Sequence, residues 1–251
     1  MATITVSTWD EMAVDYVRQR ATSPAFLTES PVVLRMLGNM REKTALDVGC
    51  GGGDYSFRLH EHGAIVLGLD PSVEMIRQAT EEQVKRGIIR GLDFKAEGLV
   101  GYSLLTGFGP QIAYDRILFA HVLNHMDDLK HAAKIVAEIS AGEGVLVVTI
   151  PHPLNTAKAY GSNELVIEDY FTARRRQETW VLNGTTYNSL YWHRPLSEYT
   201  DFFRDSGYDI IEIVEPRPSP DIKPRNDYDK VNLEKRQRLP STLAIKGIKR
   251  T

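Results

Sequence analysis

Short apolar segments alternate with longer amphipathic segments along the first 150 residues of the chain. The apolar segments predict strands, because each is short and rich in Val, Ile, Leu or Phe. They cover residues 44–48, 64–69, 92–96, 115–119 and 145–150. The last is an unbroken apolar and β-branched run, which is typical of a strand buried on both faces.

The segments between these strands carry apolar residues three and four positions apart, which predicts helices. We expect these helices at residues 10–19, 31–40, 55–60, 72–86 and 128–140. Ser72 is suited to be an N-cap, with Glu74 in the first turn, and Gly38 lies near the end of the second helix. Strands that alternate with helices predict a parallel sheet with right-handed crossovers.

The alternation stops at Pro151 and resumes near Ser197. The segment 151–195 is predicted to be an insertion, and it holds a concentration of aromatic residues: Tyr160, Tyr170, Phe171, Trp180, Tyr187, Tyr191 and Trp192. After it we expect a helix over 197–206, with Ser197 as N-cap and Gly207 just past its end. Strands over 209–215 and 241–248 follow, separated by a surface loop or partly helical segment at 217–240.

These boundaries predict four parts of the chain. Residues 1–40 form an N-terminal helical lid, and residues 41–150 form the core. Residues 151–195 form an aromatic-rich cap over the substrate, and residues 196–251 complete the sheet. A chain of 251 residues can bury a full core without disulfides or metals.

Composition limits the class of protein. The chain is 42% hydrophobic and 25% charged, with a formal net charge of −3, which gives no overall attraction to nucleic acid. No apolar run approaches membrane-spanning length, and the start lacks a signal-peptide core. Cys50 is the one cysteine, so a reducing, cytoplasmic location is expected. No Cys/His cluster or carboxylate cluster predicts a metal site.

A glycine-rich turn carries the most specific chemical signal. The first strand leads into Asp47-x-Gly49-x-Gly51-x-Gly53, and the second strand ends in Asp70. Such glycines let a bound molecule lie against main-chain atoms, and an acid after the next strand can accept hydrogen bonds from ribose hydroxyls. The acid that precedes the glycines would repel a pyrophosphate but could orient an ammonium group. The turn therefore favours a nucleoside that carries an amino acid over a dinucleotide.

This motif and strand order resemble those of the class I S-adenosylmethionine (SAM)-dependent methyltransferases, of the small-molecule type. The resemblance runs from about Trp9 to the C-terminus, with specific motifs in the first half. It implies an α/β fold with a seven-stranded, doubly wound Rossmann-like sheet, mostly parallel with an antiparallel last strand. It also implies that SAM is the cofactor.

The resemblance implies a role for several residues in holding SAM. Asp47 would lie near the ammonium group and Asp70 would bind the ribose. The glycine turn would pack against the ribose and the amino acid. The candidate cofactor-binding residues are Tyr16, Asp47, Gly49, Cys50, Gly51, Gly53, Asp70, Met75, Glu97, Ala120 and His121.

Five of these residues have a second interpretation. Asp70 could simply cap the end of its strand beside Pro71. Cys50 is expected to be a packed small residue rather than a nucleophile. Met75 could cover the adenine or fill the helix core. Glu97 could contact the adenine amino group or be an exposed loop acid, and Tyr16 could close over the cofactor or simply pack.

Methyl transfer to an oxygen or nitrogen that carries a proton can require a general base, and histidine titrates close to neutrality. The candidates are His125 and His152, which follow the fourth and fifth strands, and His193 at the end of the insertion. For each of them, a role as a hydrogen-bonded wall of the pocket is the alternative.

The expected reaction is methyl transfer to O, N or C of a small molecule with an apolar or aromatic part. The aromatic insertion would supply its pocket, or form a minicore beneath the lid, or do both. RNA methylation is an alternative because of two basic stretches, at 174–176 and 223–238. A SAM-binding protein that does not methylate is another alternative, and nicotinamide chemistry is disfavoured. A monomer or homodimer is expected.

Overall fold

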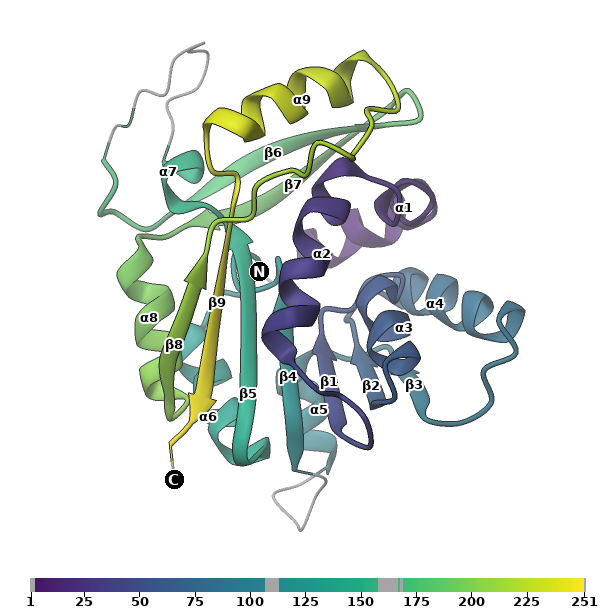
Figure 1. Cartoon of the computed structure of the whole chain (residues 1–251), viewed down its shortest axis with the longest axis vertical. Helices are drawn as coiled ribbons and strands as arrows, with labels where there is room; N and C mark the ends of the chain where they lie inside the picture. Colours follow the sequence, from purple (N-terminus) through teal and green to yellow (C-terminus); the bar gives the residue numbers. More distant parts are fainter. Residues whose placement is uncertain (1–2, 107–112, 158–166, 168, 251) are drawn as a thin grey trace.

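The computed structural model describes residues 3–106, 113–157, 167 and 169–250, so Tyr160 of the insertion lies outside the described residues. Seven strands form one sheet in the order β3-β2-β1-β4-β5-β9-β8. β9 pairs antiparallel with both of its neighbours, and every other pair is parallel. The predicted doubly wound sheet with an antiparallel last strand is confirmed (Figure 1).

The strands of this sheet agree with the predicted segments within a few residues at most ends. They are β1 (Thr44–Val48), β2 (Ile65–Leu69), β3 (Leu92–Lys95), β4 (Tyr114–Ala120), β5 (Ser140–Pro151), β8 (Tyr208–Val214) and β9 (Thr242–Lys249). β5 is the exception, because it begins five residues before the predicted start. Those extra residues include two glycines, which the apolar pattern could not assign to a strand.

Helices cover both faces of the sheet. They are α1 (Thr3–Arg20), α2 (Pro24–Leu37), α3 (Asp54–Glu61), α4 (Val73–Lys85), α5 (Leu99–Thr106), α6 (Leu129–Ile139), α7 (Pro153–Thr156), α8 (Leu196–Asp205) and α9 (Asp227–Arg238). Residues of α2 and α3 share one buried cluster with the sheet, and residues of α5, α6 and α8 share the other.

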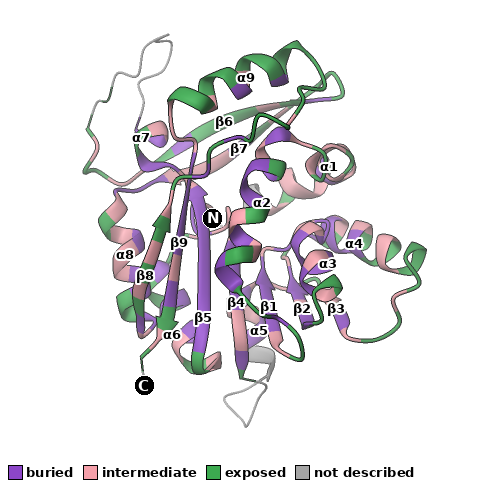
Figure 2. Ribbon diagram, viewed as in Figure 1, coloured by how far each residue is buried: buried purple, intermediate pink, exposed green. Residues whose placement is uncertain are grey.

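The alternation of side chains along each strand creates these two clusters. Ala45 and Val147 point to the α2 and α3 side, whereas Leu46 and Val148 point to the α5, α6 and α8 side. Figure 2 shows that β5 is buried along most of its length. The uninterrupted apolar run at 145–150 is therefore explained by helices on both faces.

The structure corrects three predicted helix starts. α1 begins at Thr3, seven residues before the predicted start at residue 10. α2 begins seven residues before the predicted start, because Ser23 caps it and Pro24 occupies the first turn. Pro31, which the prediction placed at the start, lies inside α2. α8 begins at Leu196, whose N–H donates to the Tyr170 hydroxyl, so Ser197 is not the N-cap.

The insertion contains a hairpin that the sequence analysis missed. β6 (Arg174–Leu182) and β7 (Thr185–His193) pair antiparallel around Asn183 and Gly184, which both have positive φ. Asn-Gly is the strongest short signal for such a two-residue turn. α5 and α7 were also missed, whereas the segment 217–240 is partly helical as predicted and contains α9.

The hairpin, α9 and α1 lie over the edge of the sheet where β4 and β5 end (Figure 1). α2 packs against β5 and β9 instead, so within the predicted lid at 1–40 it is α1 that covers this edge. Among the described residues, none of the helices combines the length and hydropathy needed to cross a bilayer.

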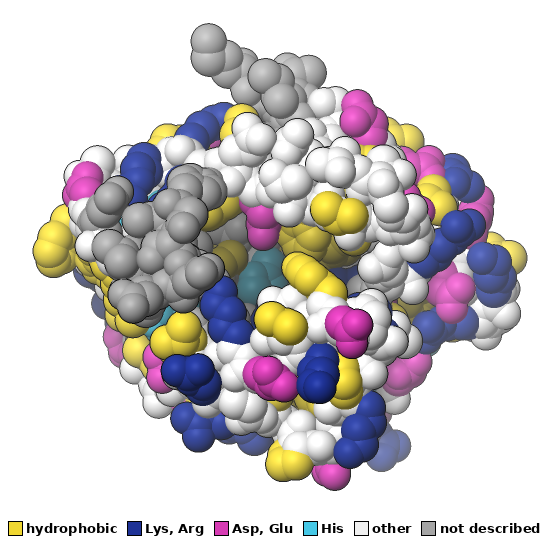
Figure 3. Space-filling view, turned by 90° about the horizontal axis from the view of Figure 1, so that it is seen from above, with side chains coloured by type: hydrophobic (Ala, Val, Ile, Leu, Met, Phe, Trp, Pro, Cys, Tyr) yellow, Lys and Arg dark blue, Asp and Glu magenta, His cyan; other side chains and the backbone are white. Residues whose placement is uncertain are grey.

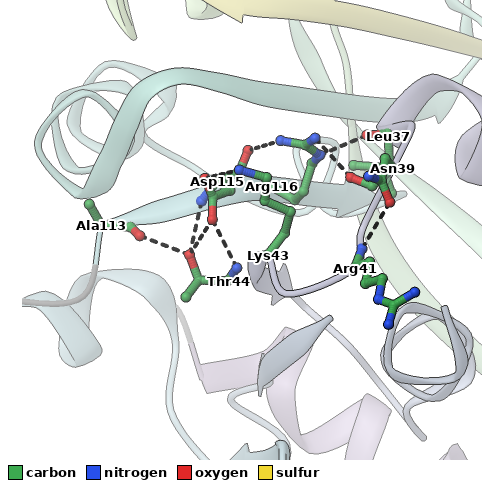
Figure 4. A network of polar contacts seen from close by, with 8 residues as sticks. All are labelled: Leu37, Asn39, Arg41, Lys43, Thr44, Ala113, Asp115 and Arg116. Carbon is green, nitrogen blue, oxygen red and sulfur yellow. Dashed lines mark hydrogen bonds and ion pairs between the residues drawn. The ribbon is translucent and has the colours of Figure 1, made fainter. Parts of the chain in front are cut away.

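A polar network at the opposite edge fixes the start of β1 and β4 (Figure 4). The Asp115 carboxylate accepts hydrogen bonds from the Thr44 N–H, at 3.0 Å, and from the Lys43 ammonium, at 3.1 Å. Arg116 donates to the carbonyls of Leu37 and Asn39 and so ties the end of α2 to β4. Burial opposes ionisation of Asp115, but these donors outweigh it and lower its pKa.

We expect Asp115→Ala to lower the free energy of unfolding by about 1.5–3 kcal/mol at pH 7, because it removes hydrogen bonds to a charged group. A carboxyl with a lowered pKa contributes stability above about pH 4 and loses it as the pH falls. The difference from the wild type should therefore shrink below pH 4 in urea unfolding. Asp93→Ala, at an exposed position on β3, is the control. If the two substitutions lower the free energy of unfolding equally, the hydrogen bonds of Asp115 do not stabilise the start of β1 and β4.

Candidate functional site

The candidate site lies where the carboxyl ends of β1 and β4 meet. These two strands are neighbours, yet the chain leaves β1 toward β2 on one side and leaves β4 toward β5 on the other. Ligands of open α/β sheets bind at such a point, because the diverging connections leave a crevice there. The glycine turn after β1 and the residues 121–126 after β4 both open onto this crevice.

The glycine turn is held in a tight conformation with one open side. Gly51 has a φ of +53°, and a Cβ there would meet only the Met75 sulfur, at 3.9 Å, so this position faces free space. Gly52 lies against Val17 of α1, and a Cβ on Gly52 would lie only 2.5 Å from that side chain. Gly49 lies equally close to Val122, and Gly53 precedes α3.

Asp70 lies beside this open position. Its carboxylate accepts hydrogen bonds from the Gly51 N–H and the Ser72 N–H, both at 2.9 Å. Burial raises the pKa of Asp70 to about 6, against the effect of these two bonds, and Asp10 raises it further. The side chain is still partly exposed, so its oxygens can accept further hydrogen bonds.

Asp47 lies below the turn at the end of β1 and is 1% exposed. It accepts a hydrogen bond of 2.6 Å from the Ser56 hydroxyl. Burial raises its pKa to about 7, and the charge of Asp70 adds to this effect. Two carboxyl groups with raised pKa values therefore flank one glycine turn, an arrangement that favours a ligand with a cation and hydrogen-bond donors.

The other predicted cofactor residues surround this turn. Met75 is buried beside Gly51, in the first turn of α4. Cys50 is buried and packs against Gly68 of β2, and burial raises the pKa of its thiol, so it is not activated as a nucleophile. Glu97 follows β3 and accepts a hydrogen bond from the Gly98 N–H. Ala120 ends β4 and leads into His121.

α1 covers the site and is attached at two places. The Asp10 carboxylate accepts hydrogen bonds from the Ser72 hydroxyl, at 2.6 Å, and the Glu74 N–H, at 3.1 Å, at the start of α4. The Asp15 carboxylate accepts from the Tyr187 hydroxyl and the Asn183 amide at the end of the hairpin. α1 and the hairpin therefore form one connected cover.

Four rings meet beneath this cover. Trp9 makes edge contacts with Tyr16, His125 and Trp180, with centroid distances of 5.4, 5.5 and 6.4 Å. Two of the rings come from α1 and one from the insertion. Figure 3, which looks onto this edge, shows a hollow lined by histidine and hydrophobic atoms, with an acidic side chain at its rim. We call these four residues the ring cluster.

The three predicted base candidates have different surroundings. His125 belongs to the ring cluster; its Nδ1–H donates to the Leu190 carbonyl, and burial lowers its pKa to about 4. His193 is fully buried, and both of its ring nitrogens are bonded, to Thr156 and to the Tyr170 carbonyl. Both nitrogens of His152 are also engaged, by the Leu154 N–H and by Glu215. Of these three histidines, only His125 is part of the ring cluster.

The sequence analysis missed Glu29 of α2, a buried acid that is 2% exposed. Its carboxylate accepts hydrogen bonds from the Tyr55 hydroxyl, at 2.7 Å, the Thr149 hydroxyl, at 3.1 Å, and His121 Nε2, at 2.5 Å. Burial opposes its ionisation, but His121 and the other donors outweigh it and lower its pKa to about 2. Glu29 is therefore an anion beneath the candidate site.

The family of the chain follows from comparison with known proteins. Residues 16–213 match the model of a family described as a methyltransferase domain. The chain belongs to this family. With the fold, this membership confirms the predicted class I methyltransferase and its cofactor SAM.

Curated relatives are distant. An uncharacterized protein from Haemophilus influenzae is 27% identical over 54% of this chain, and the match spans only 52% of that protein. A ubiquinone biosynthesis O-methyltransferase from Coxiella burnetii is 26% identical over 70% of this chain and 67% of its own length. The acceptor is therefore not established by these relatives.

Solved structures share the fold. A SAM-dependent methyltransferase from Listeria monocytogenes has a TM-score of 0.70 and 24% identity, over 89% of this chain and 97% of that one. A methyltransferase from Haloferax volcanii, solved in complex with the activator Trm112, has a TM-score of 0.65 and 16% identity, over 100% of this chain and 98% of that one.

We expect the buried charge of Asp47 to reduce the stability of the ligand-free protein at alkaline pH. A carboxyl whose pKa is higher in the folded state stabilises the fold below about pH 4, and this contribution is lost as the pH rises to 7. Asp47→Asn should therefore unfold at a higher temperature than the wild type at pH 8, by about 2–4 °C for each kcal/mol gained. At pH 5 the difference should be smaller, because only part of this contribution has been lost there. If calorimetry finds no rise in the unfolding temperature of Asp47→Asn at pH 8, neighbouring groups compensate the buried charge of Asp47 and the prediction is wrong.

Proposed function

We propose that this methyltransferase transfers the methyl group of SAM to a small molecule that is bound beneath α1 and the hairpin. The single observation that carries the proposal is the ring cluster, in which aromatic side chains of α1 and of the insertion meet His125 of the loop after β4. Enclosed sites lined by aromatic groups are typical of small-ligand pockets.

The residues around the glycine turn fit the parts of SAM. Asp70 would accept the ribose hydroxyls, and the open face at Gly51 would receive the nucleoside. Asp47, a buried carboxyl close beneath the turn, would attract the ammonium group. We expect the adenine to extend toward Met75 and Glu97, at α4 and after β3, and the methionine end of SAM to lie near Tyr16, Ala120 and His121.

Bound SAM supplies a methyl group that is already activated by its sulfonium. The main task of the protein is then to hold the acceptor atom in line with this methyl group and to exclude water. Such positioning contributes roughly 7–11 kcal/mol toward lowering the barrier. The attached cover and the ring cluster are suited to both tasks.

The alternative of RNA methylation is weakened by the partners of the basic stretches. Arg174 and Arg175 form ion pairs with Asp169 and Asp127, and Arg176 is buried. In the second stretch, Arg225 pairs with Asp229 and donates to α1. Each of these side chains has a role in the fold, which disfavours a surface for phosphates.

The cellular location and the acceptor atom are also proposals. The free, buried thiol of Cys50 supports a reducing, cytoplasmic location. The similarity to ubiquinone biosynthesis O-methyltransferases supports oxygen as the acceptor atom.

We expect Asp70→Ala to weaken SAM binding by at least about tenfold, since it removes hydrogen bonds made by a charged group. Titration calorimetry with SAM measures the change. SAM binding by the wild type should also weaken below pH 6, where Asp70 becomes protonated. Asp93→Ala on β3 should bind SAM like the wild type. Unchanged affinity in Asp70→Ala would remove Asp70 from the ribose site.

Incubation with trideuteromethyl SAM and a metabolite extract should yield a product heavier than its precursor by a trideuteromethyl group. Trp180→Ala should reduce its formation by about tenfold or more at unchanged SAM affinity, because Trp180 is the ring that the insertion contributes to the ring cluster. Labelling of RNA but of no small molecule would favour the alternative function.

A further inference from the structure

His121 has a conformation that requires support from its surroundings. Among the described residues it is one of four non-glycine residues with positive φ, at +59°, a left-handed conformation that is uncommon outside glycine although histidine adopts it more often than most residues. Its N–H donates to the Thr149 carbonyl at 2.9 Å, and its Nε2 contacts Glu29 at 2.5 Å. Strained residues persist where neighbouring groups hold them, and they are concentrated at functional sites.

The charge of Glu29 determines which nitrogen of His121 carries the proton. The Glu29 carboxylate already accepts hydrogen bonds from the Tyr55 and Thr149 hydroxyls, and its contact with Nε2 of His121 is a hydrogen bond in which Nε2 donates. In the neutral ring, Nδ1 then keeps its lone pair. Nδ1 has no hydrogen-bond partner in the part of the chain that the structure describes. The side chain is 30% exposed, whereas that of Glu29 is 3% exposed.

We propose that His121 is the general base of this methyltransferase and that it takes the proton from a hydroxyl group of the acceptor. Glu29 is its positioning residue. This inference rests on the proposed function. The acceptor oxygen forms a bond to the methyl carbon while the carbon–sulfur bond breaks, and its electron pair stays on sulfur, which becomes a neutral thioether. The hydroxyl proton passes to Nδ1 of His121, and Glu29 stabilises the resulting imidazolium.

His125 is less suited to this role. Burial lowers its pKa to about 4, so it is a weak proton acceptor at neutral pH, and its Nδ1–H is used by the Leu190 carbonyl. It lies close enough to His121 for the two charges to interact. We assign His125 to the wall of the pocket, with His121 as the residue that takes the proton.

Other charged groups surround the Glu29–His121 pair and will affect its pH dependence. Glu178 faces His121 from β6, and burial raises the pKa of this acid while His121 lowers it. Arg20 of α1 and Arg236 of α9 interact with the Glu29 carboxylate from above. The charge of His125, which lies in the same loop, also interacts with that of His121. The pH profile must therefore be compared between variants and not interpreted from the wild type alone.

The tautomer of His121 can be measured without knowing the acceptor. The protein, labelled with ¹⁵N in its histidine rings and saturated with S-adenosylhomocysteine, should show His121 as the Nε2–H form at pH 7.5. His121→Asn identifies the signal, and asparagine tolerates the left-handed backbone. An Nδ1–H form, or a ring protonated on both nitrogens, would overturn the proposal, because Nδ1 could not then accept a proton.

The rate with the hydroxyl acceptor identified from the extract tests the role of Glu29. Glu29→Gln should lower kcat about 10–100-fold at pH 7, and His121→Asn about 100-fold or more. Both losses should shrink as the pH rises toward the ionisation of the acceptor, since an ionised oxygen needs no base. The KM of Glu29→Gln for SAM should change little, because Glu29 is not among the residues assigned to SAM.

Tyr55→Phe is the matched control, because it removes one donor to Glu29 and leaves the contact with His121 in place. It should lower stability without changing the shape of the pH profile. If Glu29→Gln lowers kcat by the same factor at every pH, Glu29 is only structural. That result would overturn the proposed roles of Glu29 and His121. If the wild type methylates no small molecule, the proposed function fails, and the tautomer measurement still decides the state of His121.

Discussion

The whole site depends on one topological constraint, the adjacency of β1 and β4 in a parallel sheet. Both strands point the same way, so the glycine turn after β1 and the histidine-containing loop after β4 must emerge side by side. Their helical connections diverge to opposite faces and leave the crevice between them. The two buried clusters, one on each face, make this arrangement rigid, because a slip by one residue in any strand would exchange its faces.

Carboxylates perform different tasks at this crevice according to their surroundings. Asp47 is buried and Asp70 is partly buried, so desolvation raises the pKa of both, and they are suited to a ligand that brings positive charge and hydroxyl groups. Asp10 and Asp15 attach the cover through hydrogen bonds to α4 and to the hairpin. Glu29 has three donors and remains ionised despite complete burial. Burial and the position of the donors separate these roles, since Asp70, Asp10 and Asp15 each accept two hydrogen bonds.

The fold was largely predictable because its signals are local. The apolar runs located the strands, and the glycine turn with its two acids identified the family. The start of α2 was missed although Ser23-Pro24 marks it, and the hairpin was missed although Asn183-Gly184 marks its turn. Glu29 could not have been found in the same way. Its partners Tyr55, His121 and Thr149 lie 26, 92 and 120 positions along the chain, so only the completed sheet brings them together.

The central place of β9 has a consequence for biosynthesis. β9 pairs with β5, yet it begins at Thr242, 91 residues after β5 ends at Pro151 (242 − 151 = 91). At a translation rate of roughly 5–20 residues per second, the edge of β5 waits several seconds on the ribosome for its partner. During that interval an apolar strand has no neighbour on one side, which makes the nascent chain a candidate for chaperone binding and for edge-to-edge association.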